Sequence, residues 1–535
     1  MVTIEQIAAI LDERGLLLDF NCKRKEKEVS WLTFDSREAM PGCLFICKGA
    51  AFKEKYLEDA VEKGASFYIS EKNLPAGKEI TSLIVSDIRK AMAAVSARFF
   101  EYTPGDPVVT GITGTKGKTT TAWYLKGMLD AWQQSEGNVR TGLLSTVMND
   151  DGLHREDAVM TTPEAPQLHE FLSRAKENHV SYVTMEVSSQ ALKYKRTREL
   201  RFQVGIFLNI AEDHISPSEH EDFEDYFSSK LSMFRQSETV CINLDSDHVE
   251  RIKNAARKAK RVITFGKHPD ADIRYSDVCT QNGRTSFRVC CDRFTQRFSL
   301  KMKGKFNVEN AVAAIAAAYV YKVPVCFMKQ ALETIEVPGR METFISFDKK
   351  ICGIVDFAHN RLSFEKLFDA AFQEFGEYKK IITVFGCPGC KALNRRRELG
   401  IIAGLFSDYV VITSDDPGAE GQSGIAQEVK KYVEMTGCAY ECVDERRMAV
   451  ERAVDLAASC KERVLILLLG RGNEKYQKIG EKACLYPTDG ELMKDVLQKY
   501  EKAQNEKRKA GCPIKIPSLH VDKRVGELRM DLHFS

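Results

Sequence analysis

The 535-residue sequence lacks an excess of charge of either sign. Lysine and arginine together number 78 and aspartate and glutamate 76, which gives a formal net charge of +2. Proteins that bind nucleic acid or membrane surfaces normally carry a clear positive excess, so the balance argues against both classes. Hydrophobic residues make up 44% and charged residues 29%, as in an ordinary globular protein.

Long hydrophobic runs are also lacking. The longest, residues 311–321, is too short to span a bilayer. Glu5 and Asp12 lie where a signal peptide would need an apolar core, so we expect no secretion. The 16 cysteines have no repeating spacing, and without a signal peptide they indicate reduced thiols. These features together predict a cytoplasmic protein.

The length predicts three to four domains, at about 150 residues each. A Thr-Pro-Gly-Asp-Pro linker at residues 103–107 interrupts regular structure and ends a first block, residues 1–105. In that block, a turn at residues 41–43 leads into a short strand. A Val-Pro-Gly-Arg turn at residues 337–340 ends a second block, residues 106–338.

Strands and helical patterns alternate in the second and third blocks, which predicts α/β domains with mostly parallel sheets. The third block, residues 339–504, reads as a smaller doubly wound unit. Residues 505–535 are predicted to be a flexible tail, with a basic interaction tail as the alternative. The expected buried strands are residues 108–112, 182–185, 204–208, 351–357, 381–385, 410–413 and 464–469, and a helix is expected at residues 119–129.

Residues 113–120 read Thr-Gly-Thr-Lys-Gly-Lys-Thr-Thr and lie between a predicted strand and a predicted helix. Glycines let backbone N–H groups approach phosphate oxygens, and the start of the helix adds partial positive charge. Lys118 would reach the β- and γ-phosphates, and the Thr119 hydroxyl would bind Mg²⁺. The general phosphate-loop pattern requires glycine at position 112, where this chain has Ile112. The loop is therefore a variant of that pattern.

This variant loop resembles that of the Mur ligase family, ATP-dependent ligases that add amino acids to a cell-wall precursor. The similarity extends from about residue 35 to about residue 497. The other motifs, in the family's order, are Thr161-Thr162-Pro163, Glu186-Val187-Ser188-Ser189-Gln190, Asn209 with Asp213-His214, Phe223-Glu224-Asp225-Tyr226-Phe227 with Lys230, Gly304-Lys305-Phe306-Asn307, Gly339-Arg340-Met341-Glu342, Asp356-Phe357-Ala358-His359 and Gly470-Arg471-Gly472.

The resemblance implies a three-domain α/β architecture. An N-terminal domain would bind the UDP-sugar, a central domain with a P-loop parallel sheet would bind ATP, and a C-terminal Rossmann-like domain would bind the amino acid. The implied reaction adds the third amino acid to UDP-N-acetylmuramoyl-L-alanyl-D-glutamate through an acyl phosphate. The implied cofactors are ATP and Mg²⁺, and we expect a monomer without nucleic-acid or membrane partners.

The family match also assigns roles to residues around the nucleotide. Lys118, Lys230, His214 and Arg340 would be catalytic, and Thr119, Glu186, His214 and Lys230 would bind Mg²⁺. The matching lysine of the family reacts with CO₂ to form a carbamate, which requires an unprotonated amine. The nucleotide contacts implied are Thr113, Gly114, Thr115, Lys116, Gly117, Lys118, Thr119, Thr120, Asn307, Asn310 and Arg340.

The remaining roles concern the other two substrates. Ser36 and Arg37 would contact the uridine diphosphate. Thr161, Thr162, Ser188 and Arg196 would hold the muramoyl-dipeptide, with Arg196 pairing an anion. The implied amino-acid contacts are Arg396 to the α-carboxylate, together with Asp415, Asp416, Gly470 and Glu474.

Asp415-Asp416-Pro417-Gly418 bears on which amino acid is added. Family members that add meso-diaminopimelate have Asp-Asn-Pro-Arg here, and that arginine binds the second carboxylate. Glycine cannot do so, and Asp416 adds a negative charge, which favours a side chain ending in ammonium. L-lysine fits best; ornithine and meso-diaminopimelate are the alternatives. A further possibility is that Asp416 only caps a turn.

The sequence leaves three other interpretations open. Cys387 and Cys390 have the spacing of a redox pair, but we expect this segment to form loop backbone, with redox activity or zinc as the alternative. A folylpolyglutamate-type ligase would share the ATP core but lack the N-terminal domain. A paralogue without catalysis could act as a nucleotide-binding scaffold or sensor, although the expected catalytic residues are present.

Overall fold

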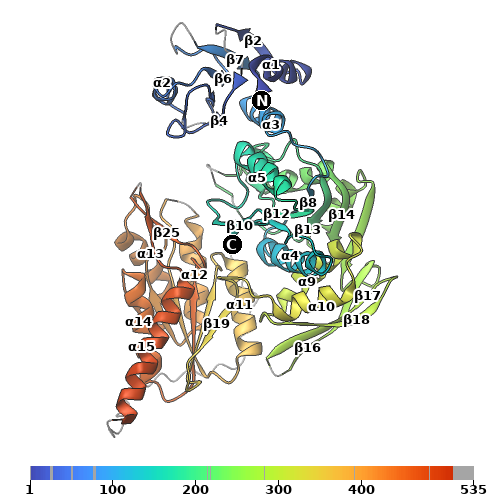
Figure 1. The fold of residues 1–535 in the computed structure, drawn as a ribbon. Coiled ribbons are helices and arrows are strands. Elements are labelled where there is room, and N and C mark those ends of the chain that lie inside the picture. The colour runs from blue at the N-terminus through green and yellow to red at the C-terminus, as the bar shows by residue number, and fades with distance from the viewer. Residues whose placement is uncertain are drawn as a thin grey trace. The chain divides into compact units, whose positions relative to one another are not determined.

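In the computed structural model, drawn as a ribbon in Figure 1, the chain forms two compact units. The first unit comprises Met1–Lys301 and Lys305–Ile335, and the second comprises Met302–Gly304 and the chain from Glu336 onward. The residues described are 2–23, 28–49, 52–75, 80–213, 215–216, 219–281, 283–390, 392–480 and 482–509, with 507–509 as backbone only.

The first unit begins with a small sheet whose strand order is β2-β7-β6-β5-β4. Only β2 runs antiparallel to its neighbour. Side chains of α1 and α3 pack on one face and those of α2 on the other. The expected strand after the turn at residues 41–43 is confirmed as β5. The elements are β1 (Val2–Thr3), α1 (Ile4–Glu13), β2 (Leu17–Asn21), β3 (Glu28–Val29), β4 (Leu32–Thr33), β5 (Leu44–Ile46), α2 (Glu54–Glu62), β6 (Phe67–Ser70), β7 (Thr81–Val85) and α3 (Ile88–Phe99).

A larger sheet follows, with strand order β11-β10-β9-β12-β8-β13-β14-β15-β16-β17-β18 in the described residues. The seven central strands, β9-β12-β8-β13-β14-β15-β16, are parallel to one another. Antiparallel pairs extend the sheet at both edges. The sheet is therefore mostly parallel, as expected, with antiparallel strands added at both edges. The strands are β8 (Val108–Thr113), β9 (Gly142–Leu144), β10 (Met148–Asp150), β11 (Arg155–Asp157), β12 (Tyr182–Glu186), β13 (Phe202–Phe207), β14 (Ser237–Asn243), β15 (Arg261–Gly266), β16 (Ile273–Gln281), β17 (Arg284–Cys290) and β18 (Thr295–Leu300).

Helices cover both faces of this sheet. On one face α4 packs against α9 and α10, and on the other α5 and α7 contribute to a single apolar cluster. The helix expected at residues 119–129 begins one residue earlier and continues to Ser135. The helices are α4 (Lys118–Ser135), α5 (Ala165–Glu177), α6 (Ser189–Lys193), α7 (Phe223–Leu231), the 3₁₀ helix η1 (Ser232–Gln236), α8 (Val249–Ala256), α9 (Phe306–Val320) and α10 (Val325–Thr334).

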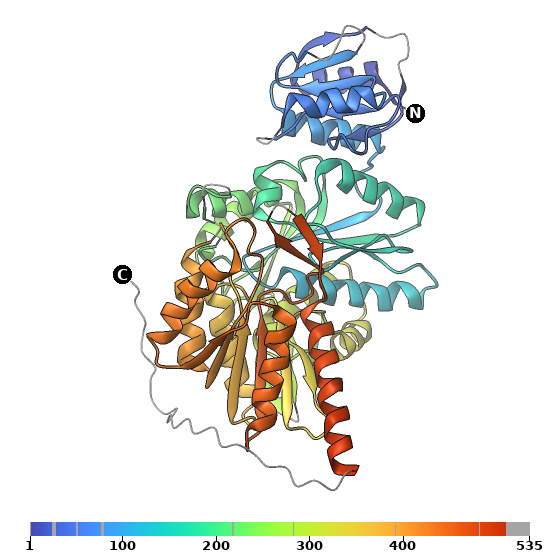
Figure 2. The ribbon, with the colours of Figure 1, turned by 90° about the vertical axis from the view of Figure 1, so that its left-hand side faces the viewer.

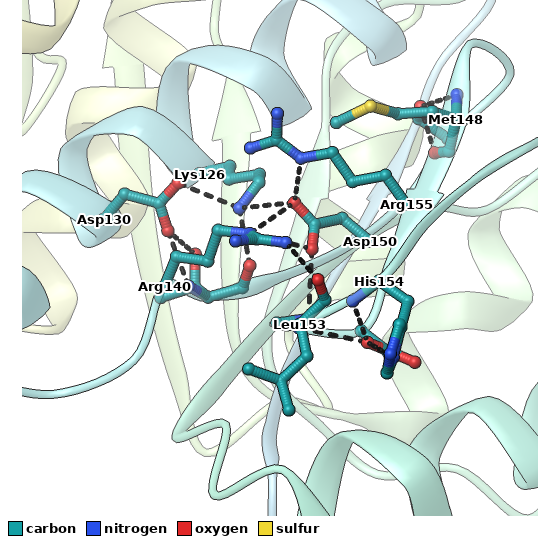
Figure 3. Close-up of polar contacts among 12 residues, drawn as sticks. Lys126, Asp130, Arg140, Met148, Asp150, Leu153, His154 and Arg155 are labelled. Carbon is teal, nitrogen blue, oxygen red and sulfur yellow. Dashed lines mark hydrogen bonds and ion pairs between the residues drawn. The ribbon is translucent and has the colours of Figure 1, made fainter.

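A buried carboxylate ties α4 to the antiparallel edge of the sheet (Figure 3). Asp150 is fully buried and lies 2.9 Å from Arg155 Nε, 3.1 Å from Arg140 Nε and 3.5 Å from Lys126 Nζ. Burial by itself would raise the pKa of Asp150, but these three cations hold it below its ordinary value. Asp150 is thus ionised in the folded chain over the physiological pH range.

We expect Asp150→Asn to lower the free energy of unfolding by about 3 kcal/mol, because it removes the buried anion that Lys126, Arg140 and Arg155 share. The depressed pKa means that the stabilisation is present above the unfolded pKa of about 3.9 and is lost as pH falls through the folded pKa. Urea unfolding at neutral and acidic pH measures both effects. Glu156→Gln, which removes an exposed partner of Arg174, is the control and should cost less than about 1 kcal/mol. Equal effects of the two variants would contradict the role given to Asp150.

The second unit contains a six-stranded sheet in the described residues, with order β19-β20-β24-β21-β22-β23. All its pairs are parallel except β19 with β20. Side chains of α14 and α15 cover one face, and these two helices lie side by side (Figure 2). The strands are β19 (Glu342–Ile345), β20 (Ile351–Asp356), β21 (Lys380–Phe385), β22 (Tyr409–Ile412), β23 (Ala439–Cys442) and β24 (Val464–Leu469).

The other helices of the second unit form a layer in which α11 packs against α12 and α12 against α13. Helices on both faces of a mostly parallel sheet confirm the expected doubly wound fold. A hairpin of β25 and β26 extends from the end of β24. The elements are α11 (Arg361–Glu374), α12 (Asn394–Phe406), α13 (Gln422–Glu434), α14 (Arg446–Ser459), β25 (Tyr476–Ile479), β26 (Lys482–Leu485) and α15 (Asp489–Lys509).

Two findings bear on the expectations from composition. None of the helices in the described part of the chain combines the length and apolar character that crossing a bilayer requires. The cysteines of the described residues all carry free thiols. Of the predicted tail, residues 505–509 belong to α15, and residues 510–535 lie outside the described residues.

Candidate active site

The loop at residues 113–120 connects β8 to α4, as the sequence predicts. Gly117 has φ +87°, and a Cβ there would lie 2.1 Å from Asn310 Oδ1. Gly114 has φ +156°, and a Cβ there would lie 2.9 Å from Leu208 Cβ. Both positions therefore need glycine, for its backbone freedom and its small size. The close approach also places Asn310 beside the loop, and Asn310 donates to Asn307 Oδ1 at 2.9 Å.

Positive charge gathers at the start of α4. Lys118 Nζ lies 2.9 Å from the Gly114 carbonyl oxygen and 3.3 Å from that of Thr115. Lys116 Nζ lies 3.4 Å from Asp213 Oδ2. With the partial positive charge of the helix N-terminus, these two ammonium groups make an anion-binding environment.

Asn209 holds the phosphate loop from the neighbouring strand β13. Its Oδ1 accepts from Lys116 N at 2.9 Å, its Nδ2 donates to Lys116 O at 3.1 Å, and its carbonyl accepts from Thr115 N at 3.1 Å. Asn209 belongs to a family motif, but sequence reasoning gave it no role. The available signal was its position just after a buried strand, where functional side chains of α/β sheets gather.

Two of the predicted magnesium ligands lie together. Thr119 Oγ1 donates to Glu186 Oε2 at 3.1 Å, and the other carboxylate oxygen of Glu186 accepts from Thr146 N at 2.8 Å. Glu186 ends β12, beside β8, and is 1% exposed. A hydroxyl next to a carboxylate suits Mg²⁺, which prefers hard oxygen ligands. His214, the third predicted ligand, lies outside the described residues.

Lys230, near the end of α7, is 2% exposed and forms no ion pair among the described residues. Its Nζ donates to the Gly114 carbonyl at 3.0 Å and lies 4.6 Å from the centre of the Tyr226 ring. Burial, and then the charge of Lys118, lower the pKa of Lys230 well below its ordinary value, while Asp213 opposes this. This environment favours the unprotonated amine over the ammonium form.

The other predicted nucleotide contacts of the first unit are buried. Thr113 ends β8 and its hydroxyl has no hydrogen-bond partner among the described residues. Thr115 Oγ1 lies 3.0 Å from the Tyr226 hydroxyl, and Thr120 lies in the first turn of α4. Tyr226, whose motif the sequence shows, thus connects the phosphate loop to α7.

The residues predicted to hold the muramoyl-dipeptide form one cluster near Glu186. Thr162 Oγ1 donates to Glu186 O at 2.9 Å and accepts from Ser188 N at 3.0 Å. Thr161 Oγ1 accepts from Thr146 Oγ1 at 3.2 Å. Arg196 donates to Thr162 O at 3.1 Å. The cluster therefore places hydroxyl groups and a guanidinium beside a predicted metal ligand.

Glu164 occupies one edge of this guanidinium. Its Oε1 lies 2.9 Å from Arg196 Nη2 and 3.0 Å from Lys48 Nζ. Lys48 follows β5 of the small sheet and Glu164 is the N-cap residue of α5, so this ion pair joins the small sheet to the start of α5. One carboxylate between two cations leaves a net positive charge, which suits an anionic substrate.

Ser36 and Arg37, the predicted uridine-diphosphate contacts, lie in a surface loop. The Arg37 guanidinium pairs with Asp35 at 2.5 Å, yet its side chain is 87% exposed. Lys63 Nζ donates to the carbonyl oxygens of Ser36 and Arg37 at 2.9 and 3.2 Å. Lys63 is a basic neighbour of this loop that sequence reasoning missed.

Three carboxylates converge in the second unit. Single oxygens of Asp415, Asp416 and Glu474 all lie within 4.8 Å of one another. Gly470 permits this, because a Cβ at that position would lie 2.8 Å from Asp415 Oδ2. Burial raises the pKa of Asp415, Arg446 and Arg471 oppose the rise, and Asp416 adds to it. Such a group can hold a cation, either a metal ion or an ammonium.

Two buried arginines, which sequence reasoning gave no role, support these carboxylates. Arg446 is bonded to Asp489 at 2.6 Å and donates to the carbonyl oxygens of Ser414 and Leu469, where β22 and β24 end. Arg471 Nη1 lies 3.3 Å from Asp416 Oδ1. Together they fix the positions of the Asp415–Asp416 loop and of Gly470.

The other predicted residues of the second unit have partners within it. Arg396 is 3% exposed and forms ion pairs of 2.6 Å with both Glu420 and Glu428. A substrate carboxylate would have to replace one of them. Arg340 donates to the Gly339 carbonyl at 2.9 Å and stacks over the Phe357 ring at 4.5 Å. The structure thus keeps Arg340 at the turn that precedes β19.

The segment with Cys387 and Cys390 is loop backbone that supports Asp416. Gly389 N donates to Asp416 O at 2.9 Å, and a Cβ on Gly389 would lie 1.9 Å from Pro417 O. Burial raises the pKa of Cys387 to about 12, which keeps this thiol protonated and unreactive.

Comparisons with known proteins agree with this arrangement. Residues 112–318 match the model of the Mur ligase middle domain, and residues 339–472 match that of the Mur ligase glutamate ligase domain. A UDP-N-acetylmuramyl-tripeptide synthetase of Lactobacillus acidophilus is 34% identical over 90% of this chain and 94% of its own. A UDP-N-acetylmuramoyl-L-alanyl-D-glutamate–L-lysine ligase of Enterococcus faecalis is 35% identical over 85% of this chain and 89% of its own.

Solved structures agree on the fold. A UDP-N-acetylmuramoyl-L-alanyl-D-glutamate–2,6-diaminopimelate ligase is similar over 94% of this chain and 99% of its own, with a TM-score of 0.62 and 21% identity. A folylpolyglutamate synthase of Mycobacterium tuberculosis covers only 71% of this chain, with a TM-score of 0.55 and 16% identity. The chain belongs to the Mur ligase family, whose members are ATP-dependent amino-acid ligases.

Proposed function

We propose that this chain adds L-lysine to UDP-N-acetylmuramoyl-L-alanyl-D-glutamate, as a monomeric cytoplasmic enzyme of peptidoglycan precursor synthesis. The observation that carries the choice of lysine is the convergence of Asp415, Asp416 and Glu474 in the amino-acid-binding unit. The name of the similar Enterococcus protein, a lysine ligase, supports the same choice.

The reaction has two steps. An oxygen of the substrate's D-glutamate carboxylate attacks the γ-phosphorus of ATP, and ADP leaves. The amine of lysine then attacks the carbonyl carbon of the acyl phosphate, inorganic phosphate leaves, and the amine loses its proton. Because the first step brings anions together, it needs concentrated positive charge, which Lys118 and the start of α4 supply. The role of Arg340 toward the nucleotide stays a prediction.

Thr119, Glu186 and a carbamate on Lys230 are the proposed magnesium ligands, with His214 as the fourth. The donor set fits, because it consists mainly of hard oxygen atoms next to the phosphate loop. When bound, the metal neutralises phosphate charge.

We propose that Lys230 carries the carbamate. Its unprotonated, neutral nitrogen bonds to the carbon of CO₂, and one proton is released, so the neutral amine becomes an anion. The buried position without an ion pair and the lowered pKa of Lys230 support this chemistry.

The other proposed roles concern the substrates. Thr161, Thr162, Ser188 and Arg196 are proposed to hold the dipeptide, and Ser36 and Arg37 the uridine diphosphate. In the second unit, Asp415, Asp416 and Glu474 would bind an ammonium group beside Gly470, and Arg396 would bind the α-carboxylate by exchanging one of its two partners. A second carboxylate, as in meso-diaminopimelate, would be repelled by the same aspartates.

Phosphate release from ATP tests the proposal. It should require the muramoyl-dipeptide nucleotide and an amino acid together, with turnover falling in the order lysine, ornithine, meso-diaminopimelate. Product mass confirms the new amide bond. A scaffold or sensor would release no phosphate, and turnover on a folate substrate instead would favour the folylpolyglutamate alternative.

We expect Gly418→Arg to raise the KM for lysine at least tenfold, about 1.4 kcal/mol. The arginine adds a positive charge near Asp416, and this charge repels the ammonium group of lysine. A Cβ on Gly418 meets no atom within 4 Å, although its φ of +56° strains any substitution. Gly421→Arg is the matched control, since Gly421 has φ +83° and equally open surroundings. Unchanged lysine turnover in Gly418→Arg would count against the loop assignment.

A further inference from the structure

A buried imidazole lies next to the proposed site without a role in the proposed chemistry. His220 has no exposed surface and precedes α7 in the chain. Its Nδ1 lies 2.9 Å from Asp225 Oδ2, and its Nε2 lies 3.0 Å from Ser189 Oγ. A carboxylate can only accept, so Nδ1 carries the proton of the first bond.

The two partners of His220 belong to different helices. Ser189 is the first residue of α6 and follows Ser188, whose backbone N–H bonds to Thr162. Asp225 lies in the first turn of α7, the helix that carries Lys230 near its other end. The imidazole therefore links the start of the proposed dipeptide-binding helix to the helix of the proposed carbamate.

A second ion pair strengthens this link. Lys193, at the end of α6, lies 2.6 Å from Asp225 Oδ2 and donates to Glu219 O at 3.1 Å. Burial opposes ionisation of Asp225, but the hydrogen bonds from Lys193 and His220 hold its pKa below the ordinary value. Asp225 thus stays an anion that accepts hydrogen bonds from Lys193 of α6 and from His220.

His220 also contacts the phosphate loop through Tyr226. The imidazole meets the Tyr226 ring edge to face, with centroids 5.3 Å apart. The hydroxyl of Tyr226 lies 3.0 Å from Thr115 Oγ1, and its ring lies 4.6 Å from Lys230 Nζ. A shift of His220 would therefore displace the dipeptide contacts, the phosphate loop and Lys230.

We propose that His220 is a positioning residue for ligation, which sets the distance between Ser188 in the dipeptide site and Lys230 in α7. It acts through Ser189 and Asp225 and does not touch substrate. This inference rests on the proposed function, because only there do Ser188 and Lys230 have roles. Misplacement of reacting groups by about 1 Å can cost about 10²-fold in rate, so the effect should fall on kcat.

Two variants separate the halves of the link. His220→Asn can keep a donor toward Asp225 but loses Ser189, and His220→Gln can reach Ser189 but loses Asp225. We expect each to lower kcat about 10- to 100-fold with the KM for lysine within twofold of wild type. Because loss of folded enzyme also lowers the apparent kcat at unchanged KM, kcat is normalised to the folded fraction measured by circular dichroism.

Ser189→Ala breaks the His220–Ser189 hydrogen bond from the other side by removing a single oxygen. In a double-mutant cycle with His220→Asn, the two losses should not add, because both remove the same hydrogen bond. His248→Gln is the control. His248 is exposed, and its ring contacts the rings of Phe223 and Phe227 of α7, with ring centroids 5.3 and 5.6 Å away. It should keep wild-type kcat.

The outcomes distinguish this inference from the proposed function. If the wild type turns over and the kcat values of the His220 and Ser189 variants all lie within twofold of the wild-type value, the positioning role alone is overturned. Additive losses in the cycle would also overturn it. A wild-type chain without turnover on the dipeptide nucleotide and lysine would overturn the proposed function and this role with it.

Discussion

Lys230→Ala is expected to lower kcat by about 10³-fold, roughly 4 kcal/mol of barrier, because it removes the proposed carbamate beside the phosphate loop. The fold should survive, since Lys230 donates only one hydrogen bond, to Gly114 O, and forms no ion pair among the described residues. Truncation of Lys230 therefore breaks no salt bridge among the described residues. Steady-state phosphate release with both substrates present measures the loss.

Rescue experiments identify the missing group. Formate or acetate should restore part of the activity of Lys230→Ala, because a small carboxylate can occupy the space of the carbamate and bind the same metal. In the wild type, ¹³C-bicarbonate should give a carbamate signal that is absent from the variant. Lys253→Ala, at an exposed lysine paired with Glu250, is the control and should behave as wild type. Full activity of Lys230→Ala would remove the carbamate from the mechanism.

Lys118→Met is expected to lower kcat/KM for ATP by about 10²- to 10³-fold, because the ammonium at the start of α4 stabilises the charge that develops on the transferred phosphate. A methionine keeps most of the length of the side chain, so the change is mainly one of charge. Lys260→Met, at a lysine with a 78% exposed side chain, is the matched control.

The same variant should also reach Lys230. The charge of Lys118 helps to lower the pKa of Lys230, so its removal raises that pKa and leaves less unprotonated amine at a given pH. The wild-type carbamate signal should therefore weaken in Lys118→Met and recover at higher pH. A carbamate signal unchanged in amount and pH dependence would contradict this coupling, whatever happens to the rate.

The phosphate loop shows how far local sequence reasoning carries. A glycine-rich segment between an apolar strand and a helix predicted both the loop and the helix start, because the two glycines serve local needs. At both glycines the need is also tertiary, since Leu208 and Asn310 lie where a Cβ on Gly114 or Gly117 would be. The antiparallel edge formed by β10 and β11 was not predicted, since these strands are three residues each and leave little pattern.

Other site residues carried a signal that could not be read without the fold. Arg396 looks in sequence like an available cation, but the fold gives it Glu420 and Glu428 as partners. Asp415 and Glu474 are far apart in the chain and meet only because β22 and β24 bring their loops to the same edge of the sheet. His220 is an ordinary loop histidine until α6 and α7 are packed together.

By itself, the sequence determined the α/β class, the phosphate loop, the family and the order of the motifs, because these depend on residue type and on spacing along the chain. Only the tertiary structure decided which charges are paired, which are buried and which converge. Burial and pairing arise between segments distant in sequence, and they set the pKa of Lys230, the ion pairs of Arg396 and the carboxylate cluster around Asp415.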